Sequence, residues 1–165
     1  MNKKNILLLL LSLITLLPSQ AKSYPFKMDH PYQVEIVRVG QEGTKFLKAY
    51  GVAGSADKAI DQAMQDAVAA CIFTGVEGTA TAGKILPLCG STKAYEEHKE
   101  YFDKFFKKGE FLNYVKNVNK GYPSGENNVA TPHGRKVGVY VSVMYDALRK
   151  KLEQDGIIKS LDSYF

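Results

Sequence analysis

The sequence has no tryptophan, only three histidines and only two cysteines among its 165 residues. This supply is too small for the paired Cys and His ligands of a structural zinc site, which needs four close side chains. The chain also lacks an H-E-x-x-H motif and a serine in a nucleophile elbow, which are short signatures of hydrolases. We therefore expect no metal, no cofactor and none of these hydrolase chemistries.

Basic side chains do not form a stripe with aromatic residues between them, which is the pattern typical of nucleic-acid binding. The chain has 22 Lys and Arg residues against 17 Asp and Glu residues, a formal net charge of +5. We expect no nucleic-acid partner. An anionic surface or an acidic partner is compatible with this mild positive charge.

A phosphate-binding loop is suggested by the spacing of Gly78 and Gly83 followed by Lys84. However, Ile85 occupies the position at which a Ser or Thr should hold magnesium. Such a loop also follows a strand and opens a helix, whereas here a helix is expected before it and Pro87 comes soon after. We interpret the segment as a loop of small residues and expect no nucleotide.

Long hydrophobic runs are absent, because the longest, residues 6–17, is shorter than the roughly 20 residues that cross a membrane. Two lysines precede this run, and small residues ending at Ala21 follow it, as in a cleavable signal peptide. We expect residues 1–21 to be removed and residues 22–165 to form a single exported domain in the periplasm or outside the cell. No transmembrane segment is expected in the mature chain.

The two cysteines, Cys71 and Cys89, are interpreted first as a disulfide, because an even number in an exported chain favours pairing. Closing this loop would stabilise the fold by roughly 3 kcal/mol in the chain-entropy model. The alternative is a pair of buried thiols that pack as small hydrophobic side chains.

Hydrophobic periodicity predicts an N-terminal hairpin followed by a helix. Residues 33–39 and 45–53 are rich in β-branched side chains and are separated by a glycine-containing turn, so they should pair antiparallel. A helix over residues 56–73 should follow, capped by Ser55, and its alanines at every fourth position should let it lie close against the sheet. Its opposite face, including Asp61 and Asp66, is expected to be solvated, as is His30 in the preceding arm.

A second helix is predicted over residues 93–108, with a half-buried His98 on its aromatic face. The candidate binding residues on that face are Tyr101, Phe102, Phe105 and Phe106. They fit the core, but an excess of aromatic rings could instead form an exposed patch that binds a partner.

The C-terminal part offers the clearest strand, residues 137–144, where valines alternate with other side chains. Residues 111–119 fit either a short helix or a strand, and residues 121–134 are expected to be a polar loop. Asp146 should cap a last helix over residues 147–155. The predicted class is α+β, an antiparallel sheet of three to four strands with two to three helices on one face, in the order β-β-α-α-(β)-β-α.

Two further candidate binding residues, His133 and Arg135, lie at the end of the long polar segment. Loops often hold functional side chains, which is why this pair is considered. No nucleophile can be assigned to His133, so a catalytic role would require a carboxylate to meet it in space.

The sequence Val52-Ala53-Gly54-Ser55, followed by a helix with alanines at positions 59, 63, 67 and 70, resembles small exported domains of Gram-negative envelopes. The likeness is to the N-terminal domain of the flagellar assembly protein FlgT and related small lipoproteins. It covers residues 33–75 and, more loosely, residues 137–152. This chain departs from them in lacking a lipobox cysteine and in having an additional aromatic helix. The resemblance implies a non-enzymatic envelope or assembly component.

These observations predict a non-enzymatic protein-binding or assembly module with an envelope protein as partner, and a homo-oligomer is compatible with them. Two alternatives stay open. A carrier of a small apolar ligand would need an enclosed cavity lined by Tyr and Phe. An enzyme acting on cell-wall or polysaccharide material would need a cleft where His133, Arg135 and a carboxylate converge.

Overall fold

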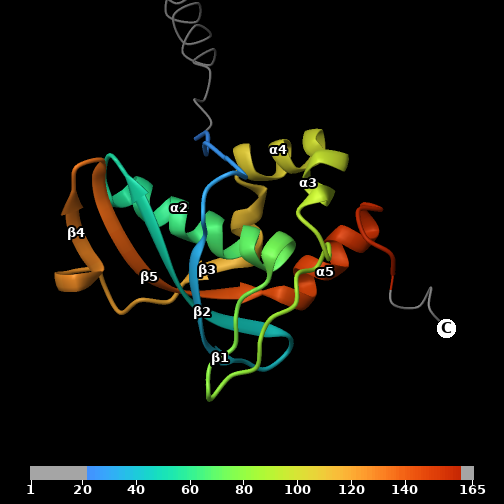
Figure 1. Ribbon diagram of the computed structural model, residues 1–165, viewed down its shortest axis with the longest axis horizontal. Coiled ribbons are helices and arrows are strands. Elements are labelled where there is room, and N and C mark those ends of the chain that lie inside the picture. Colours follow the sequence, from blue (N-terminus) through green and yellow to red (C-terminus); the bar gives the residue numbers. More distant parts are fainter. Residues whose placement is uncertain (1–21, 161–165) are drawn as a thin grey trace, which may run out of the picture.

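The computed structural model describes residues 22–160, so the predicted signal peptide lies outside the described part of the chain (Figure 1). The strands form one antiparallel sheet in the order β1-β2-β5-β3, and β4 also pairs with β5. Their bounds are β1 (Gln33–Val39), β2 (Thr44–Ala53), β3 (Val115–Asn117), β4 (Asn128–Thr131) and β5 (Gly134–Met144). The α+β class is confirmed, with a sheet of five strands.

The first helix, α2 (Ala56–Ala69), continues as the π-helical segment η2 (Ala70–Thr74) and ends at Gly75, as expected. The other helices within residues 22–160 are α3 (Lys93–Glu97), α4 (Lys99–Lys107) and α5 (Tyr145–Gln154), with 3-10 turns η3 (Glu110–Tyr114) and η4 (Gly125–Asn127). The predicted second helix is therefore two helices, because His98 leaves the helical conformation (φ −122°, ψ 34°).

Three expectations for the C-terminal part need correction. Residues 111–119 are both a 3-10 turn and a strand, η3 followed by β3. The predicted loop 121–134 contains β4, whose exposed side chains give little hydrophobic alternation for a sequence to reveal. Asp146 lies in the first turn of α5 and does not cap it, since the helix begins one residue earlier.

The core lies between α2 and the sheet. Alternate valines of β5, from Val137 to Val143, are fully buried, as are Ala59, Ala63 and Ala67 of α2. The helix comes so close that a Cβ added at Gly51 of β2 would lie 2.0 Å from the carbonyl oxygen of Ala59. Small side chains on both elements therefore determine the distance between helix and sheet.

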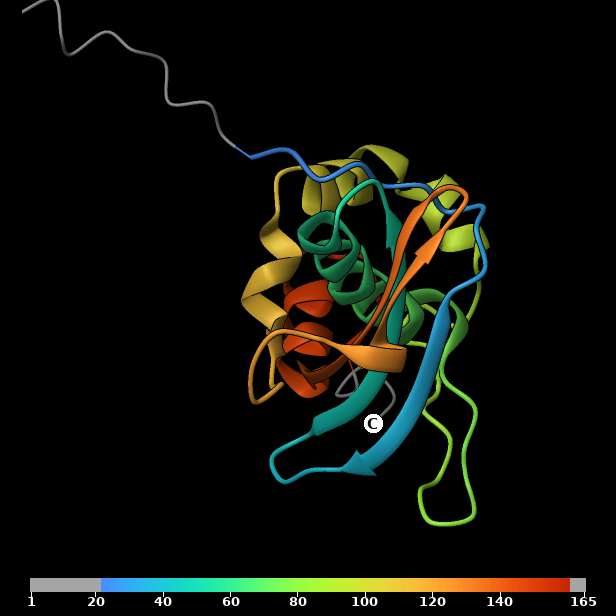
Figure 2. The same ribbon diagram turned by 90° about the vertical axis from the view of Figure 1, so that its left-hand side faces the viewer.

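The N-terminal arm, residues 22–32, crosses the helices before it enters β1 (Figure 2). The Tyr24 N–H donates a hydrogen bond to the carbonyl of Lys107 at the end of α4 (3.1 Å). Phe26 is buried and stacks on Phe106 with ring centroids 3.9 Å apart. Aromatic burial thus fastens the arm to the domain.

The predicted disulfide is wrong, because Cys71 and Cys89 are both free thiols. Backbone hydrogen bonds pair Cys71 with Leu88 and Cys89 with Ile72, so the two cysteines do not stand opposite one another. Burial raises the pKa of Cys71 to about 12 and that of Cys89 to about 11, which disfavours the reactive thiolate. The alternative of buried thiols describes Cys71 fully and Cys89 in part.

Candidate functional site

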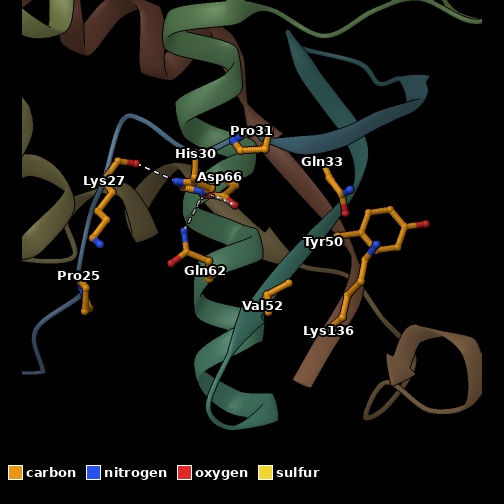
Figure 3. Close-up of a pocket in the computed structure, with 10 residues that line it drawn as sticks. All are labelled: Pro25, Lys27, His30, Pro31, Gln33, Tyr50, Val52, Gln62, Asp66 and Lys136. Atoms are coloured by element: carbon orange, nitrogen blue, oxygen red, sulfur yellow. Dashed lines mark hydrogen bonds and ion pairs between the residues drawn. The ribbon is translucent and has the colours of Figure 1, made fainter. Parts of the chain in front are cut away.

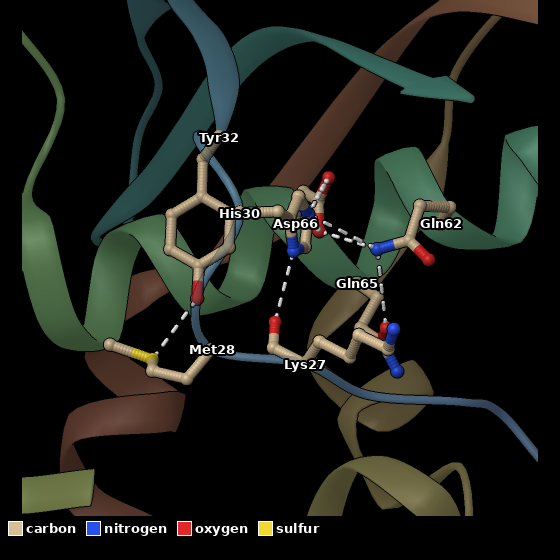
Figure 4. A network of polar contacts seen from close by, with 7 residues as sticks. All are labelled: Lys27, Met28, His30, Tyr32, Gln62, Gln65 and Asp66. Carbon is tan, nitrogen blue, oxygen red and sulfur yellow. Dashed lines mark hydrogen bonds and ion pairs between the residues drawn. The ribbon is translucent and has the colours of Figure 1, made fainter.

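A polar cluster joins the arm to the outward face of α2 (Figure 4). Asp66 is only 2% exposed, and His30 Nε2 lies 3.0 Å from both of its carboxylate oxygens. Gln62 Nε2, one helical turn earlier, donates to Asp66 Oδ1 at 2.7 Å. The carboxylate is therefore buried with hydrogen-bond partners from the arm and from its own helix.

Both ring nitrogens of His30 are occupied. Nδ1 lies 3.0 Å from the carbonyl oxygen of Lys27, and Nε2 faces Asp66. A carbonyl oxygen only accepts, so Nδ1 carries a proton. The histidine therefore has no free nitrogen with which to take a proton from a substrate, and its role in this geometry is to fasten the arm.

Burial raises the pKa of Asp66 above its ordinary value, and the hydrogen bonds from His30 and Gln62 lower it in part. The loss of water around the carboxylate is the larger cause, because most of its surface is covered. Asp66 is thus a group that the fold holds at a cost, in contrast to the exposed carboxylates of the helix surface.

The expectation of solvation is wrong for Asp66 and holds only in part for His30, whose side chain is 33% exposed and bonded to Asp66. The two residues are far apart in sequence, and Asp66 lies on the polar side of a helix, where a charged residue usually faces water. The available signal is the arm itself, since Tyr24 and Phe26 predict that this segment packs onto the domain. Nothing in the sequence pattern of α2 predicts that the arm packs against its polar side.

Two adjoining hollows, of about 550 Å³ and about 300 Å³, form a groove between the arm, the polar side of α2 and the end of β2. Figure 3 shows the larger one. Both are lined by Pro25 and Gln62. The larger also has walls from Tyr50, Val52 and Lys136 of the sheet. We call this space the arm groove.

An open strand edge borders the arm groove. Pairing of β1 with β2 stops at Gln33 and Tyr50, while β5 pairs with β2 along its other side as far as Ala53. Continuing the β1 register would place Pro31 opposite Val52, and proline has no N–H to donate to a ladder. The arm turns away toward α2 there, and Val52 is left 49% exposed.

The backbone groups of Val52 point into this opening. The Val118 N–H donates to the Tyr140 carbonyl (2.9 Å), so Tyr140 directs that group away from β2. The backbone N–H and C=O groups of successive residues point to opposite sides of an antiparallel strand. Val137, three residues before Tyr140, therefore directs these groups toward β2, where its partner is Gly51. The next residue of β2, Val52, therefore directs its N–H and C=O away from β5 and toward the arm groove.

The acidic residues at the groove already have basic side chains as partners, whereas several lysines have no acidic partner. Asp66 meets His30, and Asp61 lies 2.6 Å from Lys22 Nζ. The groove lining holds Lys22, which makes that pair, and three further lysines, Lys27, Lys58 and Lys136, which form no ion pair within residues 22–160. The groove therefore has a positive rim.

The aromatic candidate residues lie elsewhere. Phe102, Phe105 and Phe106 are buried in the core around α4, so the exposed-patch interpretation is wrong for them and the core interpretation is confirmed. Tyr101 is half-buried and its hydroxyl donates to Asp155 at 2.6 Å. The aromatic face of α4 therefore packs within the domain and does not border the arm groove.

His133 and Arg135 are also outside the groove lining. His133 is exposed in the turn between β4 and β5. Arg135 donates to the side-chain oxygen (2.7 Å) and to the carbonyl oxygen (3.1 Å) of Asn128 on the neighbouring strand. Both interactions stabilise the hairpin, and no carboxylate forms an ion pair with Arg135 in the described part of the chain.

The glycine-rich segment from Gly78 to Lys84 is an irregular loop, closed at its base by a β-bridge between Val76 and Ile85. A phosphate-binding loop would lead directly into a helix, but the next helix starts only at Lys93. Among residues 22–160, no three His, Cys, Asp or Glu side chains lie close enough to hold a metal ion. Nor does any helix in that range have the length and apolarity to span a membrane.

Comparisons with known proteins return no relative. No family model matches the chain, and neither a curated protein nor a solved structure is significantly similar to it. The likeness to FlgT-type domains therefore stays a hypothesis drawn from the sequence. The case for the arm groove depends on its geometry and charge alone.

Proposed function

We propose that this chain is a non-enzymatic protein-binding module of the cell envelope, exported to the periplasm or the cell surface, whose binding site is the arm groove. The observation that carries the proposal is the opening between the arm, α2 and β2, where a strand edge and unpaired lysines face the same space. A site of this kind suits a protein segment, because backbone groups and side chains can both be recognised there.

The alternatives find less support in the same residues. An enzyme needs a base that can accept a proton, and His30 has both ring nitrogens engaged while His133 is exposed on a turn. A carrier of an apolar ligand needs an enclosed aromatic cavity. The arm groove instead has mixed walls of proline, lysine and glutamine, with Tyr50 and Tyr24 as its aromatic residues.

Site-specific photocrosslinking in cells tests the proposal. A benzoylphenylalanine placed at Val52 should give a defined protein adduct in the envelope or secreted fraction. The matched control is Val39, which is 50% exposed on the same hairpin but at the end of β1 away from the groove. Equal adducts at both positions, no adduct at Val52, or a chain confined to the cytoplasm would contradict the proposal.

A further inference from the structure

We infer that the arm groove takes an extended peptide segment with acidic side chains, which pairs its backbone with Val52 as a short strand in line with β1. This inference depends on the proposed function and names the chemistry of the partner. Three independent features of the groove support it.

The first feature is the backbone of Val52. Its N–H and C=O face the opening, and only a chain with its own alternating donors and acceptors can satisfy both at once. Pro31 prevents the arm from doing so, because the arm has no N–H at the position opposite Val52. The groove therefore presents one complete strand-pairing position that none of residues 22–160 fills.

The second feature is a buried amide farther along the groove. Gln65 is 1% exposed and lines the smaller hollow, and its Nε2 has no hydrogen-bond partner among the described residues. Its Oε1 already lies 3.5 Å from Gln62 Nε2. A buried donor without a partner is costly, and a small displacement of the Gln65 side chain toward the hollow would let it donate to a peptide carbonyl beside α2.

The third feature is charge. Lys27 and Lys136 stand on opposite sides of the larger hollow, one on the arm and one on β5, and neither has an acidic partner in the described part of the chain (Figure 3). Asp66 is matched by His30. An acidic side chain beside the paired strand would meet these cations, whereas a basic one would meet like charge.

The experiment starts from a phage-displayed library of linear 12-residue peptides, selected on the purified protein. The best peptide is synthesised and titrated against Val52→Pro and Val52→Thr. Proline removes the single N–H and is tolerated at an exposed strand edge, whereas threonine keeps the N–H. We expect Val52→Pro to weaken binding about tenfold and Val52→Thr to change it less than about twofold.

A second measurement tests strand pairing without the proline variant, which could misfold. The same peptide is synthesised with one N-methyl group at each position in turn, and binding to the unaltered protein should be lost at one position only, that of the residue opposite Val52, because the groove offers a single strand-pairing position. Selected peptides should also be rich in Asp and Glu, and Lys27→Gln with Lys136→Gln should weaken them, most strongly at low salt.

The outcomes separate this inference from the proposed function. Peptides that bind the groove but tolerate Val52→Pro and every N-methyl group would overturn strand pairing and leave the binding role standing. Enrichment of basic peptides would overturn the acidic assignment. Peptides that crosslink equally to benzoylphenylalanine at Val39 and at Val52 would contradict both proposals.

Discussion

Helix α2 has two buried sides that arise in different ways. One side consists of alanines that lie against β2 and β5, and the other consists of glutamines and Asp66 that lie under the N-terminal arm. The alanine side buries small apolar surface by close approach. The polar side lies under the arm, and His30 and Gln62 supply hydrogen bonds to the buried carboxylate of Asp66. The same helix thus shows that burial can follow from its own pattern or from a distant partner.

The alanine side should be the less tolerant of change. In Gly51→Ala the added methyl group would overlap the Ala59 carbonyl, and neither backbone can move freely. We expect a loss of about 3 kcal/mol of unfolding free energy, measured by urea denaturation. Gly54→Ala is the control, since among residues 22–160 no heavy atom other than those of its chain neighbours lies within 4 Å of its Cβ position. A loss as small as that of the control would show that the close packing of helix and sheet is not required.

A substitution at the contact between the arm and the polar side of α2 should cost less stability than one on the alanine side, and it should release the arm specifically. His30→Ala removes the arm's hydrogen bonds to Asp66 and leaves a buried carboxylate with fewer partners, so we expect a loss of about 2 kcal/mol. Limited trypsin digestion should also cleave faster after Lys27, because the arm is released there. His133→Ala, on an exposed turn, should change neither readout. Unchanged cleavage in His30→Ala would show that other contacts hold the arm.

The smallest effect should be the pH dependence that Asp66, on the polar side of α2, gives to the free energy of unfolding. Burial raises the pKa of Asp66 in the folded protein above its ordinary value of 3.8. The folded state then binds more protons than the unfolded state in the interval above 3.8, so the contribution of Asp66 to stability decreases as pH rises through that interval. Urea unfolding from pH 3 to about 7 measures the unfolding free energy of the wild type and of Asp66→Asn, and the wild type should lose stability relative to the variant as pH rises. A wild type that gains stability relative to Asp66→Asn as pH rises would mean that the interaction with His30 outweighs burial.

The sequence predicts the alanine side of this comparison well. The hairpin of β1 and β2, the register of alanines along α2 and the buried valines of β5 all follow from local periodicity, and each is confirmed. The ends of α4 and α5 at Gly109 and Gly156 follow from glycines with positive φ. These features depend on neighbours within a few residues, which a pattern can reveal.

The polar side and the arm groove could not be predicted in this way. His30 and Asp66 meet through a tertiary contact, and helical periodicity assigns Asp66 to the solvent. The groove depends on where β1 stops pairing, which Pro31 determines only once the register of the hairpin is known. The sequence directed attention instead to His133 and to the aromatic residues of α4, which the fold uses for a turn and for the core.

Amide hydrogen exchange at Val52, followed by NMR on the purified protein, tests the open strand edge most directly. Val52 lies within a strand, yet its N–H should exchange rapidly because it faces the groove, while the N–H of Gly51 next to it should be protected by β5. Addition of a selected peptide should then slow exchange at Val52. If Val52 exchanges as slowly as Gly51 without any peptide, the edge is already closed and the account of the arm groove is contradicted.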